Sequence, residues 1–438
     1  MKYKFYPVIS GLVLFAILFS VFYIPARSHI DLIFFRLIPW VSMTAIVVVI
    51  FIANRQSCFD WINKKWINDR DQIKIDWVVL DYIIISFCLL LFLVVIVNFD
   101  RTNYFGSLGI IWRYFLPVSL YLAYRSGFLG LNFFNIMLFL FSILLANLTI
   151  LESFLQNIAA ILIYGDEHAE VAYNIQRQGV RVMFNSAVKI IRARGSANYA
   201  QITGSLHAVL ALFYLNTLLV RGKKSSFLKE IMRNISIKQE RTIMLLGLSL
   251  TILALYLTGS GTAWLILCIG TIIIYSSRYN VPVIWMFLSM IALIPIVFIA
   301  FLLKSDFFGY YDSLVLVVLN SITNYVKFVF NNFSIHALFG FREQWIVSSF
   351  SSETAFFNQL VEIGIVPFVC LLLLLGHCFK IMLVFYKNNK NMLYLPLMPI
   401  CLFVGTVHYD SVFMYPNNLL FYAAIGMSVN MFYQAKNR

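Results

Sequence analysis

The chain has 438 residues, of which 61% are hydrophobic and 12% are charged, and its formal net charge is +14. A soluble domain of this length could not bury so much apolar surface, so the composition excludes a soluble fold and predicts a multi-pass membrane protein. In a soluble protein this positive charge would suggest a nucleic-acid partner. In a membrane protein, Lys and Arg residues in the loops set the topology, and no nucleic-acid partner is expected.

Long apolar runs divide the chain into about twelve predicted transmembrane helices within one polytopic domain, residues 1–438. About 20 apolar residues cross the hydrocarbon core as a helix, and shorter runs are accepted where they form pairs. The expected fold class is therefore all-α and integral to the membrane. The predicted spans are residues 7–25, 33–53, 77–98, 108–124, 131–151, 198–220, 242–257, 262–276, 281–303, 357–380, 393–407 and 416–433.

Basic loops set the expected orientation. The loops at residues 54–76 and 221–241 are rich in Lys and Arg, and they fall on the same side as the amino terminus and the basic tail, residues 436–438. Because positive loops stay inside, both termini are predicted to be cytoplasmic. Two long segments, residues 152–197 and 304–356, then face outside together.

The first external segment is basic, although the topology rule makes external loops poor in Lys and Arg. Read as a helix, it separates basic and polar residues on one face from apolar residues on the other, as a helix on a membrane surface does. Two interpretations stay open: contact with anionic headgroups, and binding of a phosphate-bearing lipid substrate, which we prefer. The basic face consists of Arg177, Arg181, Asn185, Lys189 and Arg192.

Glycines mark two local features later in the chain. Gly259 and Gly261 separate two short apolar runs and predict a tight turn between antiparallel helices. Gly364 and Pro367 predict a kink or break just before a long apolar span. Glu362 lies close to the membrane beside that break, where its carboxylate needs a partner or a wet cavity.

The sequence contains no Gly-rich phosphate loop, no nucleotide fingerprint and no His or Cys cluster with metal-ligand spacing. Its acidic residues are too sparse to argue for a two-carboxylate glycosidase. Neither a metal nor a cofactor is therefore expected.

Five short motifs follow one another along the chain after residue 191. They are Arg192-Ala193-Arg194-Gly195-Ser196-Ala197-Asn198, Thr258-Gly259-Ser260-Gly261-Thr262-Ala263, Leu338-Phe339-Gly340-Phe341, Ser352-Glu353-Thr354-Ala355 and Leu360-Val361-Glu362-Ile363-Gly364-Ile365. This order resembles the bacterial O-antigen polymerase and O-antigen ligase superfamily (the Wzy and WaaL proteins), over about the last two-thirds of the chain.

The resemblance implies a metal-independent glycosyltransferase of the bacterial inner membrane, with a GT-C-like multi-helix architecture and long periplasmic segments. Its donor would be a glycan on undecaprenyl diphosphate, with membrane lipid as a second partner and a chain-length regulator left open. Arginines of the family hold the diphosphate, and a planar guanidinium can grip two phosphate oxygens. The implied diphosphate-binding residues are Arg177, Arg181, Arg192, Arg194 and Arg342.

The sugar hydroxyl that accepts the glycan needs a base. Glu353 is the first candidate, although its place after Ser351 and Ser352 is equally that of a carboxylate in the first turn of a helix. His408 and Asp410, in the last external loop, are the alternatives, and Glu362 is a further one.

Two departures from the family bear on the type of activity. Gly261 stands where the family often has Arg, and the interval before the late helix lacks the His that ligases typically carry there. The second departure favours a polymerase over a ligase that transfers glycan to lipid A–core. A flippase or transporter of the same lipid-linked oligosaccharide is a second alternative, although no clear internal repeat supports it. A non-enzymatic membrane scaffold is a third, although it would not need a basic external segment. His207 and His377, inside predicted spans, are interpreted as packed, hydrogen-bonded residues.

Overall fold

The computed structural model of the chain describes a set of helices and their connections. All regular structure in this described part is helical and none of it is strand, which confirms the all-α prediction there. The structure describes residues 7–19, 41–46, 48–49, 79–98, 114–164, 200–219, 236–290, 322–330, 335–340, 355–406, 412–413 and 416–436.

Several of the described helices are long and apolar enough to cross a membrane, so a multi-pass membrane protein is supported, while twelve spans and the assignment of sides stay predictions. They are α3 (Val79–Val97), Leu131–Ser153 within α6 (Leu131–Tyr164), α10 (Ile237–Thr258), α11 (Gly261–Arg278) and α17 (Ile365–Asn388). Further described helices are α5 (Val118–Arg125), α8 (Ala200–Leu218), α18 (Tyr394–Gly405) and α19 (Asn417–Lys436).

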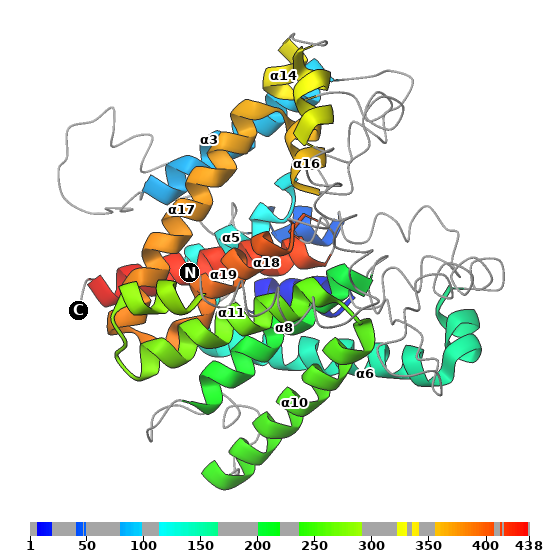
Figure 1. Cartoon of the computed structure of the whole chain (residues 1–438), viewed down its shortest axis with the longest axis vertical. Helices are drawn as coiled ribbons and strands as arrows, with labels where there is room; N and C mark the ends of the chain where they lie inside the picture. Colours follow the sequence, from blue (N-terminus) through cyan, green and yellow to red (C-terminus); the bar gives the residue numbers. More distant parts are fainter. Residues whose placement is uncertain are drawn as a thin grey trace.

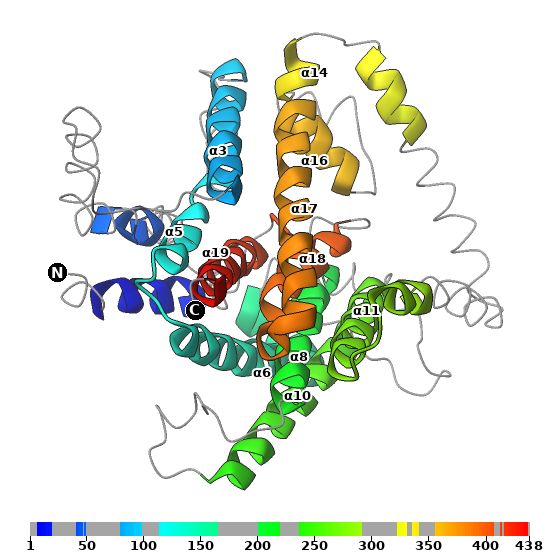
Figure 2. The ribbon, with the colours of Figure 1, turned by 90° about the vertical axis from the view of Figure 1, so that its left-hand side faces the viewer.

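α8 and α19 form the centre of the molecule (Figures 1 and 2). Every residue from 202 to 214 on α8, and from 417 to 430 on α19, is buried. α8 packs against α10, α11 and α18, whereas α19 packs against α5 and α18. Over these stretches both helices are therefore enclosed by protein on all sides, while the outer helices have a free face.

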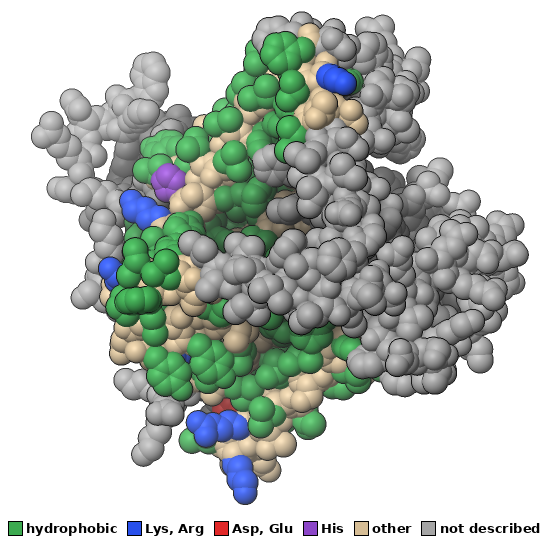
Figure 3. All heavy atoms as spheres, in the orientation of Figure 1, with side chains coloured by type: hydrophobic (Ala, Val, Ile, Leu, Met, Phe, Trp, Pro, Cys, Tyr) green, Lys and Arg blue, Asp and Glu red, His purple; other side chains and the backbone are tan. Residues whose placement is uncertain are grey.

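The outer helices α3 and α17 pack against each other. Their free faces are apolar: Leu89 and Phe92 on α3, and Leu372 and Leu373 on α17, are more than 40% exposed. Figure 3 shows that hydrophobic side chains cover most of the described surface on that face, with few Lys or Arg side chains, toward its margins. An apolar exposed surface on apolar helices of spanning length matches contact with lipid chains.

Glycines let two outer helices approach α8 closely. A β-carbon on Gly270 of α11 would lie 2.2 Å from Leu212 Cδ1, and one on Gly247 of α10 would lie 2.6 Å from the Tyr214 ring. Small residues at such crossings allow backbones to come together where lipid gives no hydrophobic driving force between helices.

The turn between α10 and α11 agrees with the sequence prediction. α10 ends at Thr258, and Gly259 caps it in the left-handed region with φ 59°. The Ser260 hydroxyl then accepts a hydrogen bond from the Ala263 amide and starts α11. Gly259 therefore supplies the positive φ that the turn requires, and Ser260 supplies the N-cap.

The predicted break at Gly364 is also confirmed. The helix α16 (Ala355–Ile363) ends one residue before it, and α17 begins one residue after it. Pro367 lies in the first turn of α17, where its missing amide hydrogen has no intrahelical acceptor to lose.

Three short helices form a small cluster of their own, which we call the cap: residues 322–330, α14 (Ile335–Phe339) and α16. Its buried residues are Phe328, Ala337 and Val361. The Tyr325 and Phe357 rings pack with centroids 5.4 Å apart, and burial raises the pKa of the Tyr325 hydroxyl. α14 connects the cap to the rest of the molecule by packing against α3 and α17.

Candidate functional site

The residues predicted from sequence to carry the chemistry lie outside the described residues. The structure therefore shows how the chain on either side of them is held, and it does not place these side chains. They are Glu353, His408, Asp410, Arg177, Arg181, Arg192, Arg194 and Arg342.

The start of α8, which follows the Arg192–Asn198 motif, contacts the α10–α11 turn at Gly204. A β-carbon on Gly204 would lie 2.7 Å from Ser260 Cβ and 2.8 Å from Thr258 Oγ1. Thr258 and Ser260 are both buried. Two of the motifs that carry the resemblance therefore flank one contact, which only a residue without a side chain allows at this position.

His207 lies one turn further along α8 and is fully buried. Its Nε2 lies 3.0 Å from Thr149 Oγ1 on α6, and that hydroxyl donates to Leu145 O at 2.8 Å. Because the hydroxyl proton is already used, His207 donates from Nε2, and Nδ1 is the unprotonated nitrogen. The prediction of a packed, hydrogen-bonded histidine is confirmed, and its partner Thr149 was not foreseen.

Glu152 lies one turn beyond Thr149 on α6 and is only 3% exposed. Sequence reasoning placed it at the start of an external segment, because hydropathy falls there. In the structure α6 continues to Tyr164, so this carboxylate is part of a helix packed among other helices. A buried carboxylate requires hydrogen bonds or an opposite charge. Glu152 is therefore a second buried polar side chain on this part of α6, one turn after Thr149.

The first residue of α19 also reaches the start of α8. Asn417 is fully buried, and its Nδ2 donates to Ile202 O at 3.3 Å. The contacts of Thr149, Gly204, His207, Ser260 and Asn417 around the first two turns of α8 are called the α8 junction below. It brings the ends of α8, α10, α11 and α19 together with the middle of α6.

A second contact joins two more of the motifs, where the cap meets α17. Gly340 has φ +84°, and a β-carbon there would lie 2.1 Å from Glu362 O. Gly364 has φ +81°, and a β-carbon there would lie 2.4 Å from both Gly340 N and Leu338 O. The backbones of the Leu338–Phe341 and Leu360–Ile365 motifs are therefore in direct contact.

α3 and the segment before α5 complete this second contact. Asn98, just after α3, donates from Nδ2 to Phe339 O at 3.1 Å and to Val94 O at 2.9 Å. The fully buried Tyr114 donates its hydroxyl hydrogen to Glu362 Oε2 at 2.8 Å. Glu362 thus has the partner that its position at the membrane requires, supplied by a residue 248 positions earlier.

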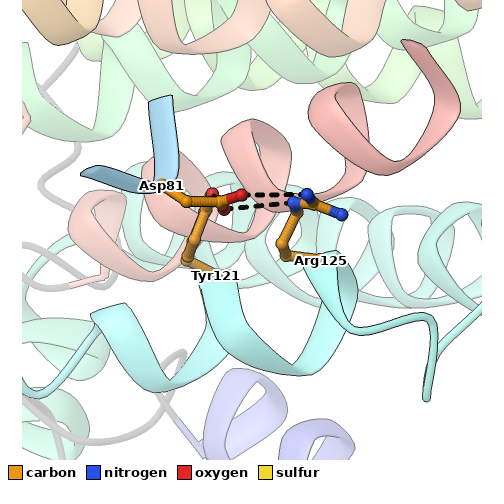
Figure 4. Close-up of polar contacts among 3 residues, drawn as sticks. All are labelled: Asp81, Tyr121 and Arg125. Atoms are coloured by element: carbon orange, nitrogen blue, oxygen red, sulfur yellow. Dashed lines mark hydrogen bonds and ion pairs between the residues drawn. The ribbon is translucent and has the colours of Figure 1, made fainter. Parts of the chain in front are cut away.

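An ion pair lies at the opposite end of α3 (Figure 4). Asp81, in the first turn of α3, accepts two hydrogen bonds from Arg125: Nη2 lies 2.9 Å from Oδ2, and Nε lies 3.1 Å from Oδ1. The Tyr121 hydroxyl also donates to Oδ1. Arg125 Cζ lies 5.2 Å from the centre of the Tyr433 ring. These contacts link α3, α5 and α19. The Asp81 carboxylate accepts its hydrogen bonds from Arg125 and Tyr121, which are side chains of the protein itself.

Sequence reasoning did not single out Asp81 or Arg125. A signal was present, because the predicted topology places the start of span 77–98 and the end of span 108–124 on one side. Opposite charges at two such helix ends predict an ion pair. The long-range polar contacts of the α8 junction and of Glu362 likewise join helix ends that the same topology places together.

No protein-family model matches this chain, and the comparison with curated proteins finds no match. What bears on its function is the order of its motifs and the glycine contacts at Gly204, Gly340 and Gly364.

Proposed function

We propose that this protein polymerises undecaprenyl-diphosphate-linked oligosaccharide repeats into O-antigen or a related surface polysaccharide. In this proposal it is a metal-independent glycosyltransferase of the bacterial inner membrane. It acts at the periplasmic face, and both of its termini are cytoplasmic.

One observation supports this proposal above the others: two of the motifs are in direct backbone contact. Gly340 contacts the backbone at Glu362, and Gly364 contacts that of Gly340. Gly204 of α8, six residues after the Arg192–Asn198 motif, contacts a third motif, the Thr258–Ala263 turn. The motifs were grouped by a resemblance in sequence order alone, and such contacts are expected if they serve one common site.

The residues that the proposed chemistry needs lie close in sequence to the segments that make these contacts. Arg342 follows Gly340 by two residues, and Glu353 precedes α16 by two residues. Arg192 and Arg194 precede α8 by fewer than ten residues. In sequence, therefore, the described residues at the two glycine contacts lie close to the proposed cations for a diphosphate and the proposed carboxylate for a hydroxyl proton.

The proposed step is a glycosyl transfer. A sugar hydroxyl of the next lipid-linked repeat attacks the anomeric carbon of the growing glycan, and Glu353 accepts the hydroxyl proton. The bond from that carbon to the diphosphate oxygen breaks, and undecaprenyl diphosphate leaves with the bonding electrons. Negative charge grows on the leaving group as this bond breaks, so preorganised arginines stabilise the transition state more than the ground state.

The experiment that tests this function is a deletion in the source bacterium, read on a polysaccharide gel. Loss of a polymerase leaves lipid A–core carrying a single repeat, and the full-length gene restores the ladder. Core without any repeat, together with polymer accumulating on undecaprenyl diphosphate, would identify a ligase instead. Core without repeat and without such polymer would identify a transporter.

The sidedness belongs to the same proposal and has its own measurement. Reporter fusions after residues near Asp166 and Phe333 should report the periplasm, and fusions near Lys64 and Lys229 the cytoplasm. A cytoplasmic signal at Asp166 would move the proposed site to the wrong face for this reaction.

A further inference from the structure

Glu362 is fixed at both its backbone and its side chain. Its carbonyl oxygen lies against Gly340, at a distance that leaves no room for a β-carbon there. Its carboxylate accepts the hydrogen bond from Tyr114 at 2.8 Å. Its neighbours Val361 and Ile363 are both buried, so the end of α16 is packed on both sides of Glu362.

Tyr114 contacts a different part of the chain with its ring. The ring centroid lies 4.4 Å from that of Phe413, and Phe413 packs in turn against Phe421 of α19 at 5.9 Å. Phe413 is fully buried and lies two residues from the segment 407–411. Tyr114 is therefore a bridge between the break at Gly364 and the connection from α18 to α19.

Besides Glu362 itself, the three other candidate proton acceptors lie close in sequence to the two segments that this bridge joins. Glu353 lies nine residues before Glu362, on the chain that enters α16. His408 and Asp410 lie between the end of α18 and Phe413. The relative position of these segments affects any reaction that uses them, because misplacing reacting groups by about 1 Å can lower a rate about a hundredfold.

We propose that Glu362 and Tyr114 are a positioning pair, which sets the end of α16 against Phe413 in the connection from α18 to α19. This inference rests on the proposed function. The pair requires a hydrogen-bond acceptor at position 362 and a donor at position 114. Glu362 accordingly acts through its hydrogen bond with Tyr114 and is not the base of the reaction.

The experiment compares full-length variants in proteoliposomes that contain the undecaprenyl-diphosphate-linked repeat from the source bacterium. Tyr114→Phe and Glu362→Ala should each lower kcat about tenfold or more, with little change in KM, because the substrate contacts stay in place. The double variant should be no slower than either single one, since both substitutions remove the same hydrogen bond. Glu362→Gln should keep at least about a third of the rate, because an amide oxygen still accepts from Tyr114.

Two outcomes would overturn the positioning role. If Glu362→Gln is as inactive as Glu362→Ala while Tyr114→Phe is active, Glu362 takes part as a carboxylate. If the losses of Tyr114→Phe and Glu362→Ala multiply in the double variant, the two residues act independently. Tyr275→Phe and Glu240→Gln, on α11 and α10, are matched controls that should leave kcat unchanged.

A readout that needs no polymerisation separates this inference from the proposed function. Hydrogen exchange of the backbone at residues 416–422 should rise equally in Tyr114→Phe and Glu362→Ala, and should stay at the wild-type level in Glu362→Gln. If the variants show this exchange pattern but the wild-type protein makes no polymer, the proposed function fails while the positioning pair stands. If exchange does not depend on the pair, the inference fails whatever the activity is.

Discussion

Gly340 and Gly364 contact each other through their backbones, and each has a positive φ. Gly364 has φ 81° and ψ 169°, a conformation that is essentially restricted to glycine. A methyl group at either position would overlap backbone atoms that cannot move aside without shifting a helix.

The first prediction concerns Gly364→Ala, which should destabilise the protein by about 2 kcal/mol or more, from the backbone strain and the overlap together. The measurement is the thermal unfolding midpoint in detergent. Gly376→Ala is the matched control on α17, because a β-carbon there meets nothing within 4 Å. That control should gain about 0.5–1 kcal/mol from helix propensity, and equal losses in both variants would contradict the contact.

The second prediction concerns the ion pair of Asp81 and Arg125. Asp81→Ala leaves a guanidinium without its carboxylate in a mostly buried position, which costs about 3–5 kcal/mol. Arg125→Ala should cost a similar amount, and the double variant should cost clearly less than the sum. Unfolding midpoints of the four proteins give the coupling. Strict additivity would show that the two side chains do not interact. Lys238→Ala, on the exposed start of α10, is the control and should change the unfolding midpoint little.

A third prediction contrasts two glycines at the α8 junction and the adjoining turn. Gly204→Ala places a methyl group 2.7 Å from Ser260 Cβ, so it should push the turn away from α8 and lower the unfolding midpoint. At Gly261 a β-carbon meets nothing within 4 Å. Gly261→Arg, which restores the residue common in the resembled family, should therefore fold normally and keep the polymer. A midpoint for Gly261→Arg as low as that for Gly204→Ala would contradict this view of the turn.

The fourth prediction tests Glu353 as the base. Glu353→Gln removes the carboxylate that accepts a proton, so polymer should disappear while the protein level stays normal. If Glu353 only caps a helix, the amide still accepts a backbone hydrogen bond and polymer persists. A normal ladder on the gel would transfer the assignment to His408 or Asp410.

The last prediction weighs diphosphate binding against headgroup binding in the basic segment. Lysine keeps the charge but cannot form two parallel hydrogen bonds to phosphate, so Arg192→Lys or Arg194→Lys should shorten or abolish the polymer. Removing one such donor typically lowers a rate about a hundredfold. Arg177→Lys should be milder. If lysine substitutes freely at all three positions at matched expression, the segment is a lipid anchor, where each charge contributes about 1 kcal/mol.

Hydropathy predicted the five described helices of spanning length, but it located the ends of some of them poorly. Predicted span 242–257 begins five residues after the start of α10, because hydropathy does not detect the polar first turn. That turn is helical because Ser236 and Gln239 form a capping box. The same limitation applies to α6, which continues thirteen residues past predicted span 131–151. The breaks at Gly259 and Gly364 were predicted, because glycine's access to positive φ is a local property.

The contacts between distant segments could not be predicted from one sequence. Glu362 was expected to need a partner, but nothing local distinguishes Tyr114 from the other tyrosines of the chain. The pairing of His207 with Thr149 depends on how α6 and α8 cross, which hydropathy does not report. The eight proposed site residues lie outside the described part of the structure, so their roles stay predictions.

The enclosure of α8 has a consequence for how the chain is made. Asn216 is fully buried in the finished molecule, yet it is synthesised long before α10, α11 and α18, which pack against α8. Asn216, for example, donates to Asn391 O, 175 residues later. Until residue 391 is made, the Asn216 side chain lacks this acceptor, which lipid cannot replace. The packing of α8 is therefore completed by the carboxyl-terminal part of the chain, and a nascent chain stopped before Asn391 leaves this polar group without its acceptor in the finished fold.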